Sequence, residues 1–327
     1  MADSSATLTA VAEQAGVSRS TASRVFSQPH RLSAETVRRV RAVAAALGYE
    51  PRSRERALSG VRSQRLALLV ADLSNPFFPP MIRAVEERAA AAGYSVLVGD
   101  TDEDAKREEA LLSRFGPDVD GFVMASSRMP AEAILAQARK RAVVLVNRDL
   151  ADVPRVLIDT TSGVTQAVDH LARLGHTRIT YLSGPTRSWS NTQRREAVRR
   201  AGELRGLSVL ITSGRRSSYD AGRAAVGQLL ASGSTAVIAF DDLLAHGILA
   251  GLADRGVAVP AEFSVIGCDD VLPPYLTTVS DAAAAAGAAA LALLLSHLTT
   301  PLPKHHHRHT LPTTLIPRTT TSRAHHN

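Results

Sequence analysis

The sequence predicts an α/β protein: an all-α N-terminal headpiece followed by two Rossmann-like lobes, each built on a parallel sheet. Two patterns carry this prediction. Residues 7–49 show only helical spacing of apolar residues, whereas residues 65–282 alternate short apolar runs with helical patterns in two consecutive sets. Continuous apolar strands between helices are typical of parallel sheets covered on both faces. The length of 327 residues suits two or three domains.

Three short helices are predicted in the headpiece. Gly16 breaks the first helical pattern, and Ser18 is a favourable N-cap for the second. Ser33 caps the third, which ends at Gly48. The predicted helices cover residues 8–14, 18–27 and 33–47.

The remaining chain supplies the elements of the two lobes. Strands are predicted at residues 66–71, 95–98, 121–125, 143–146 and 156–158, and then at 179–182, 208–211, 236–240 and 263–267. The helices between them are predicted at 77–92, 105–115 and 131–141, and then at 162–174, 191–205, 218–232 and 243–255. An Ala-rich helix at 282–298 and a last strand near 311–316 complete the fold.

Positive charge is concentrated at the N-terminus. Residues 1–65 carry eleven Arg and five acidic residues, a net charge of +6, whereas the other 262 residues carry a net charge of only +1. This asymmetry indicates a polyanionic partner for the N-terminal segment and a different ligand for the body. Residues 52–64 form a polar, Arg-rich connector between the two.

The first two predicted helices have the size of a helix-turn-helix, which predicts double-stranded DNA as the polyanion. The second helix begins with short hydroxyl side chains and Arg, the types that bond phosphates and guanine edges. A small helical bundle with a solvated basic face is the alternative interpretation. The candidate DNA-binding residues of this segment are Ser18, Arg19, Ser20, Thr21, Arg24, Ser27 and Arg31.

These residues lie in a string that resembles the DNA-binding domain of the lactose/galactose-repressor (LacI/GalR) family. The string is LTAVAEQAGVSRSTASRVFSQPHRLSAETVRRVRAVAAALGYEPR. Further matches follow in the family's order: SNPFFPPMIRAVEERAAAAGYSVLVGDTDED, VDGFVMASS, HLARLGHTRITYLSGP, SVIGCDD and LTTV. The resemblance extends from about Thr7 to Ile316.

The resemblance implies a repressor that binds a pseudo-palindromic operator as a homodimer. It implies a headpiece at 1–51, a hinge and linker at 52–64, and an effector-binding body at 65–327 that resembles the type I periplasmic binding fold. Leu58 matches the hinge leucine that wedges into the minor groove, although ordinary helix packing is the alternative. The first lobe would span about 65–159 and 283–310, and the second about 160–282 and 311–318.

Such a body holds its ligand in the cleft between the lobes, outside the carboxyl ends of the strands. Arg194 and Asp269 match the family's effector-binding arginine and aspartate, and Asp241 stands where the family often has Asn. Helix capping is the alternative role for both aspartates, and lobe packing for Trp189. The candidate effector-binding residues are Asp72, Ser74, Phe77, Asn147, Trp189, Arg194, Asp241 and Asp269.

Departures from the family pattern concern the walls of this cleft. The loop TSGRRSS lacks the aromatic residue common there, so one wall is either missing or supplied by Tyr219. Carboxylates and Arg suit the vicinal hydroxyls of a sugar, and aromatic residues are few. We therefore expect a carbohydrate inducer, with a purine-like co-repressor as the alternative.

Several other classes of protein are disfavoured. The single cysteine, Cys268, excludes an internal disulfide and any cysteine-based zinc site. No catalytic or phosphate-binding motif occurs, so we expect neither an enzyme, such as a sugar kinase, nor a cofactor. The absence of a secretory signal pattern and of a long apolar run predicts a cytoplasmic protein that does not contact membranes, and argues against a solute-binding protein. A metal site is conceivable only at the histidines His305, His306, His307, His309, His325 and His326.

Overall fold

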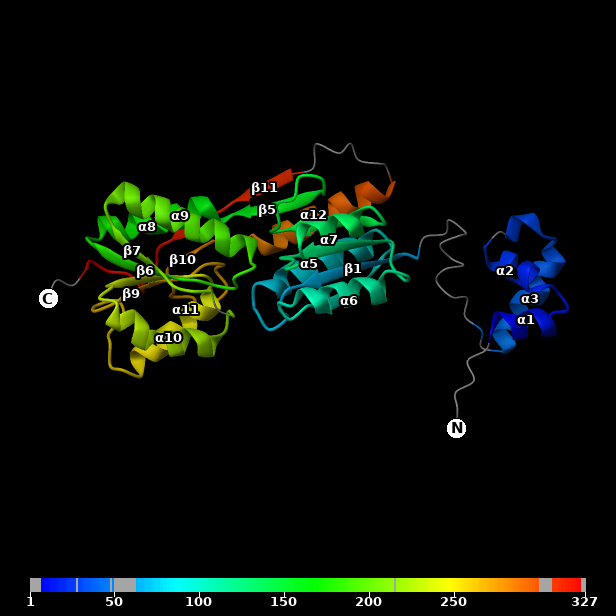
Figure 1. Cartoon of the computed structure of the whole chain (residues 1–327), viewed down its shortest axis with the longest axis horizontal. Helices are drawn as coiled ribbons and strands as arrows, with labels where there is room; N and C mark the ends of the chain where they lie inside the picture. The colour runs from blue at the N-terminus through cyan, green and yellow to red at the C-terminus, as the bar shows by residue number, and fades with distance from the viewer. Residues whose placement is uncertain are drawn as a thin grey trace. The chain divides into compact units, whose positions relative to one another are not determined.

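The computed structural model describes residues 7–27, 29–47, 49, 63–214, 216–280, 282–299 and 308–324. The chain divides into two compact units, which are described separately: residues 1–65 with 113–120, and residues 66–112 with 121–327. The first contains the headpiece, and the second contains both lobes of the body (Figure 1). No described helix is long and apolar enough to span a membrane.

The headpiece is a three-helix bundle, as predicted. Thr7 caps the first helix by accepting the Ala10 N–H at 3.2 Å, and Ser33 caps the third through the Thr36 N–H at 3.3 Å. Gly16, at φ +64°, allows the tight turn between the first two helices. The helices are α1 (Leu8–Gln14), α2 (Arg19–Ser27) and α3 (Ala34–Ala46), with a 3-10 turn η1 at Pro29–Arg31. The core comprises Val11, Ala12, Ala15, Ala22, Val25, Val40, Ala44 and Tyr49.

The first lobe is a six-stranded sheet with the order β11-β5-β4-β3-β1-β2. All of its pairings with a recorded register are parallel. Helices connect most of these strands, as parallel pairing usually requires, whereas β5 follows β4 through a loop without a helix. Helix α12 packs against α5 and lies across β3, β4 and β5. The elements are β1 (Arg65–Val70), α5 (Phe78–Ala91), β2 (Ser95–Asp100), α6 (Ala105–Phe115), β3 (Gly121–Ala125), α7 (Ala131–Ala138), β4 (Ala142–Val146), β5 (Arg155–Asp159), α12 (Ala283–Thr299) and β11 (Arg308–Pro312).

The second lobe is a four-stranded parallel sheet with the order β7-β6-β8-β9. Figure 1 shows α8 and α9 on one side of this sheet and α10 and α11 on the other. Strands β6, β8 and β9 are mostly buried apolar residues, which explains why they read as continuous runs, whereas β7 at the edge of the sheet is exposed or half-buried. The elements are α8 (Thr160–Arg173), β6 (Arg178–Leu182), α9 (Trp189–Arg205), β7 (Ser208–Ile211), α10 (Tyr219–Ala231), β8 (Ala236–Ala239), α11 (Asp242–Ala253) and β9 (Ser264–Ile266).

The chain crosses between the lobes three times, and the last crossing corrects one prediction. The strand expected at 311–316 is two strands: β11, which pairs with β5, and β12 (Leu315–Ile316), which pairs antiparallel with β10 (Thr278–Val279). Residues 311 and 312 therefore lie in the first lobe, not the second. The chain turns at Pro312, which has no N–H for the ladder, and the Thr313 hydroxyl donates to the Asp159 carbonyl at 2.7 Å.

Candidate functional site

Helix α2 presents the headpiece's candidate DNA-binding side chains. Ser18 caps it, since its Oγ accepts the Thr21 N–H at 3.1 Å and lies 2.8 Å from the Thr21 hydroxyl. Ala22 and Val25 anchor the opposite face in the core, which leaves Arg19, Ser20 and Arg24 exposed. The helix thus offers two guanidinium groups and a hydroxyl on its outer surface.

The structure describes only some of the other residues that were predicted to contact DNA. Thr21 is half-buried beside Ser18, and Arg31 is exposed at the end of η1. Ser27 ends α2, but its side chain is outside the described part of the chain. Leu58 and the rest of the predicted hinge lie outside the described residues. Ser18 acts as a cap, so any phosphate contact must share its oxygen.

In the body, the carboxyl ends of strands from both lobes converge on a cleft. A hollow of about 300 Å³ there is lined by Glu103 and Arg128 of the first lobe and by Pro185, Thr186, Arg187, Gly214 and Arg216 of the second. Non-glycine residues with positive φ follow several of these strands, namely Asp102, Glu103, Ser126, Asn147, Asp269 and Asp270. Backbone conformations of this kind concentrate at ligand sites, where the surrounding fold over-determines them.

A buried ion pair joins two of the predicted effector residues. Arg194 projects from α9, and its Nη2 donates to Asp269 Oδ1 at 2.9 Å. Its Nη1 donates to the Phe240 carbonyl, and its guanidinium lies 4.8 Å from the Phe240 ring. Burial opposes the charge, yet the acidic groups around it, Cys268 and then Asp269, raise the pKa of Arg194 above its ordinary value. Nε of Arg194 is buried and has no partner among the described residues.

Asp241 serves the fold and the cleft together. Its Oδ1 accepts the Leu244 N–H at 2.9 Å and so caps α11. Its Oδ2 accepts from Ser217 and, at 3.0 Å, from the Asn75 side chain of the opposite lobe. Burial raises the pKa of Asp241, and the Ser217 hydroxyl opposes that shift. The sequence posed helix capping and a place in the cleft as alternatives, but the Asp241 carboxylate both caps α11 and bonds a residue of the opposite lobe.

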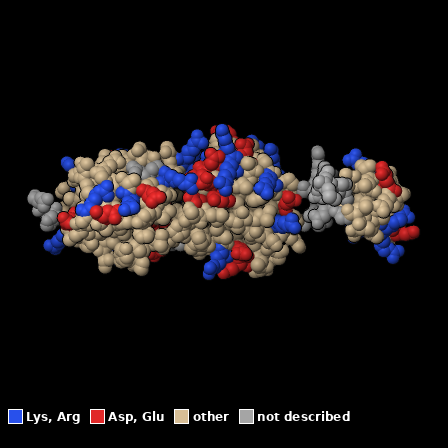
Figure 2. All heavy atoms as spheres, turned by 90° about the horizontal axis from the view of Figure 1, so that it is seen from below, with Lys and Arg blue, Asp and Glu red and all other residues tan. Residues whose placement is uncertain are grey.

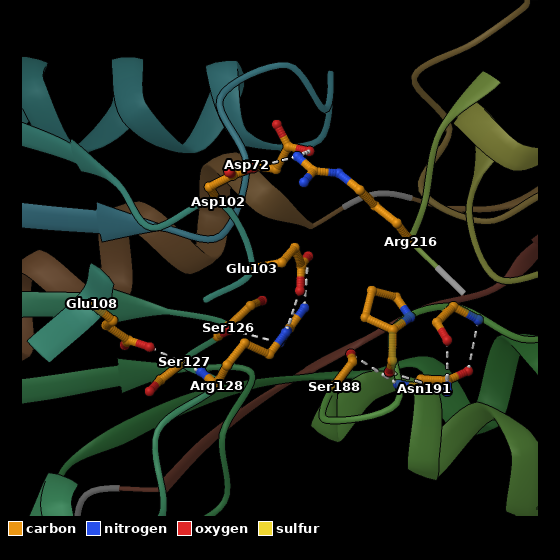
Figure 3. A network of polar contacts seen from close by, with 12 residues as sticks. Asp72, Asp102, Glu103, Glu108, Ser126, Ser127, Arg128, Ser188, Asn191 and Arg216 are labelled. Atoms are coloured by element: carbon orange, nitrogen blue, oxygen red, sulfur yellow. Dashed lines mark hydrogen bonds and ion pairs between the residues drawn. The ribbon is translucent and has the colours of Figure 1, made fainter. Parts of the chain in front are cut away.

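A second contact between the lobes involves Arg216, which sequence reasoning missed. Its Nη2 reaches Asp72 Oδ2 at 3.2 Å and also pairs with Asp102 (Figure 3). Asp72 additionally accepts the N–H and hydroxyl of Ser74, at 2.8 and 2.6 Å. Arg216, through its hydrogen bond and charge, lowers the pKa of Asp102. The loop that lacks an aromatic residue thus supplies a cation that joins the lobes.

Arg128 forms a further network in the first lobe that was not predicted. Its guanidinium pairs with Glu103 and donates to the Ser126 carbonyl at 2.6 Å (Figure 3). Its N–H donates to Glu108 at 3.0 Å, and burial raises the pKa of that carboxyl. The available signal was the segment Ser-Ser-Arg directly after the strand at 121–125.

Three predicted effector residues have other surroundings. Asn147 Oδ1 accepts the Ile158 N–H at 3.0 Å and so ties β4 to β5. Phe77 is buried at the start of α5 and packs edge-on against Phe78, with ring centroids 5.1 Å apart. Trp189 lines a different hollow beside the ends of β5 and β11. Tyr219, the suggested replacement wall, packs against His246 at 5.2 Å.

The histidine cluster receives no support from the described residues. His309 lies in β11, whereas His305, His306, His307, His325 and His326 lie outside the described part of the chain. Among described residues, no group of three or more His, Cys, Asp or Glu side chains is arranged to hold a metal ion.

Two family models match the chain. Residues 7–52 match the model described as bacterial regulatory proteins, lacI family, and residues 168–321 match a periplasmic binding protein-like domain. The regulator DegA of Bacillus subtilis is 33% identical over 287 residues, covering 83% of this chain and 85% of that protein. The repressor CytR of Escherichia coli K12 is 30% identical over 293 residues, covering 85% of each.

Solved structures agree with this assignment. The lac repressor dimer bound to operator and an anti-inducer has a TM-score of 0.72 and 26% identity, covering 97% of this chain and 99% of that one. A LacI family regulator from Enterococcus faecium with bound ribose has a TM-score of 0.71 and 27% identity, covering 80% and 100%. The chain therefore belongs to the LacI family of bacterial regulatory proteins, DNA-binding transcription regulators with a periplasmic-binding-protein-like body.

Proposed function

We propose that this protein is a homodimeric cytoplasmic repressor that releases its operator when a sugar binds between the lobes of its body. The observation that carries the proposal is the buried Arg194–Asp269 pair of the second lobe, in which Arg194 projects from α9 and Asp269 follows the carboxyl end of β9. A guanidinium and a carboxylate held in fixed geometry can bond vicinal hydroxyls in both directions. The unpartnered Arg194 Nε adds a donor that a ligand oxygen could satisfy.

The comparisons support a carbohydrate as the ligand class. Similar solved structures hold ribose or, in the regulator CelR, cellobiose; the CelR complex has a TM-score of 0.72 and 28% identity, covering 96% of this chain and 99% of that one. Binding would bias DNA affinity only if the sugar prefers one arrangement of the lobes. A coupling of about 1–3 kcal/mol would change operator affinity about 5- to 150-fold.

A thermal-shift screen of the full chain against mono- and disaccharides, sugar acids and purines tests the proposal. A ligand at about 100 times its dissociation constant should stabilise the protein by about 2.7 kcal/mol, a shift of several degrees. Asp269→Asn should abolish the shift, whereas Arg200→Ala, which removes an exposed pair on α9, should retain it. The compound that binds should then dissociate the protein from an operator selected from random DNA.

The outcomes separate the alternatives. Tighter DNA binding in the presence of the compound would replace the inducer by a co-repressor. A shift that survives Asp269→Asn would move the ligand away from the Arg194–Asp269 pair. Absence of selective binding from any random DNA pool would contradict the repressor function itself.

A further inference from the structure

A second hollow lies where the chain crosses from the first lobe to the second, at Asp159 and Thr160. It has a volume of about 250 Å³, and both lobes contribute to its walls: β5 and β11 from the first, α8 and α9 from the second. We call it the hinge-side hollow; it shares no lining residue with the cleft described above. Its lining residues are Leu157, Ile158, Asp159, Thr160, Thr161, Trp189, Gln193, Arg308 and Thr310.

One polar group of this lining is left unsatisfied. The side-chain hydroxyl of Thr160, at the start of α8, is buried and has no hydrogen-bond partner among the described residues. The whole residue is 3% exposed. A buried hydroxyl without a partner is destabilising, so a native structure that retains one calls for a group that bonds it.

The chemistry of the walls restricts what that group can belong to. Asp159 and Gln193 supply acceptors, Arg308 supplies donors, and the three threonine hydroxyls can do either. The formal charges of Asp159 and Arg308 cancel, so the hollow favours neither an anion nor a cation. Trp189, the only tryptophan, adds a flat apolar surface that suits the C–H face of a sugar ring.

Some of these polar side chains already form hydrogen bonds within the protein. Asp159 Oδ1 accepts the Thr161 N–H at 3.2 Å, so the carboxylate is oriented at the wall. Arg308 Nη1 donates to Thr310 Oγ1 at 3.1 Å, and its Nε lies 3.5 Å from Asp149. Arg308 is about half exposed, so this weak surface pair is easily exchanged for a ligand bond.

We propose that the hinge-side hollow is a second ligand site, for a neutral polyhydroxylated molecule the size of one sugar ring. The volume is below the usual range for drug-sized ligands, which limits the occupant to a single ring. The occupant bonds the Thr160 hydroxyl and packs on Trp189. Because both lobes line the site, its affinity depends on the angle between them, and the site becomes a second input to DNA binding.

The intrinsic fluorescence of the full chain tests the proposal directly, because Trp189 is the only tryptophan. The neutral probes are D-ribose, D-glucose and myo-inositol, titrated in the millimolar range. Glucose 6-phosphate is the anionic compound with which they are compared. We expect saturable changes in emission with at least one neutral probe and weaker or no binding of the phosphate. Thr160→Val, which keeps the shape and removes the hydroxyl, should weaken that binding about two- to tenfold.

Two further variants keep the interpretation unambiguous. Ser162→Ala removes an exposed hydroxyl from α8 outside the hollow and should leave the titration unchanged. Thr160→Val should melt at or above the wild-type temperature, since it removes an unsatisfied buried group. Asp269→Asn identifies probes that act through the cleft instead.

The proposal is overturned if no probe gives a saturable change, or if Thr160→Val binds as the wild type does. It is also overturned if every emission change disappears in Asp269→Asn, because Trp189 then reports only closure of the cleft. Selective binding of glucose 6-phosphate would contradict the assigned neutral class.

Discussion

The consecutive aspartates Asp241 and Asp242, which follow β8, bond different parts of the body. Asp241 caps α11 and reaches Asn75 across the cleft. Asp242 is buried behind it and accepts from the Thr278 hydroxyl at 2.6 Å and from the Val271 and Leu272 N–H groups at 2.8 and 3.1 Å. Its carboxylate therefore organises the loop after β9 rather than a ligand.

The pH dependence of stability should identify Asp242. Burial raises the pKa of Asp242 from 3.8 to about 7, with donated hydrogen bonds opposing the shift. Between about pH 4 and pH 7 the unfolded chain loses this proton and the folded chain keeps it, so the free energy of unfolding falls as pH rises. The contribution is on the order of 4 kcal/mol at most.

Asp242→Asn should therefore be more stable than the wild type at about pH 8 and closely similar at about pH 4, because the amide can accept both N–H bonds and donate to Thr278. Denaturant unfolding at the two pH values measures this. Asp242→Ala is the control and should be destabilised at both. Equal offsets of the Asn variant at both pH values would show that Asp242 is ionised in the folded protein.

Arg24 is the residue on which we expect operator recognition to depend most. It is exposed on α2, one turn after Ser20, whereas the next residue, Val25, is buried in the core. Arg24→Ala should weaken binding to a selected operator by about 1–3 kcal/mol and change binding to random DNA much less. Competition titrations of both DNAs measure the ratio, with Arg200→Ala in the body as control. A uniform loss on both DNAs would make Arg24 a phosphate contact.

At the scale of elements, glycines decide how closely α10 and α11 approach. A Cβ on Gly247 would lie 1.9 Å from the Tyr219 carbonyl oxygen, and one on Gly222 would lie 2.2 Å from the Leu244 carbonyl oxygen. Backbone oxygens of a neighbouring helix cannot move aside as a flexible side chain can. The two helices therefore pack through their backbones, a contact that only glycine permits.

Gly247→Ala should destabilise the second lobe by about 1–3 kcal/mol or more, because the added methyl forces the helices apart. Gly227→Ala is the control: this glycine lies in α10, the helix that packs against the α11 helix of Gly247, yet its added Cβ meets nothing within 4 Å. That variant should gain up to about 1 kcal/mol from helix propensity. Thermal melts compare the two, and equal effects would contradict the close approach of α10 and α11.

At the scale of the whole body, contacts between side chains hold the two lobes together in this structure. Arg216 pairs with Asp72 and Asp102, and Asn75 donates to Asp241. Figure 2 shows acidic and basic side chains intermixed over one face of the body, which accords with its near-zero net charge. Because Arg216 is about half exposed, its pair is weak and sensitive to salt.

Arg216→Ala should open the ligand-free body slightly and weaken the cleft ligand about two- to fivefold, since closing would then cost binding energy. Small-angle scattering measures the radius of gyration, and titration measures the affinity. Arg200→Ala removes a pair that stays within α9 and should change neither. An unchanged radius together with an unchanged affinity would show that the lobe angle does not depend on Arg216.

The sequence by itself determined the order of elements, the helix caps and most of the strand ends. Such features depend on residues near one another in the chain: Ser18 and Ser33 cap the helices that follow them, and buried strands read as apolar runs. The resemblance to a known family named Arg194 and Asp269 as effector-binding residues, and the structure shows that they pair although they lie 75 positions apart. Helix-capping residues and the spacing of apolar residues are local patterns, so they cannot predict a contact between residues that far apart in the chain.

Only the tertiary structure decided which strand-end residues meet and which way they face. Arg216 joins Asp72 and Asp102 from more than a hundred positions away. Trp189 lines a hollow beside β5 and β11, whereas Arg194 on the same helix bonds Asp269. The single strand predicted at 311–316 is two strands, because β11 pairs with β5 of the first lobe and β12 pairs with β10. Side-chain direction and sheet partners follow from packing between distant segments, which local spacing does not specify.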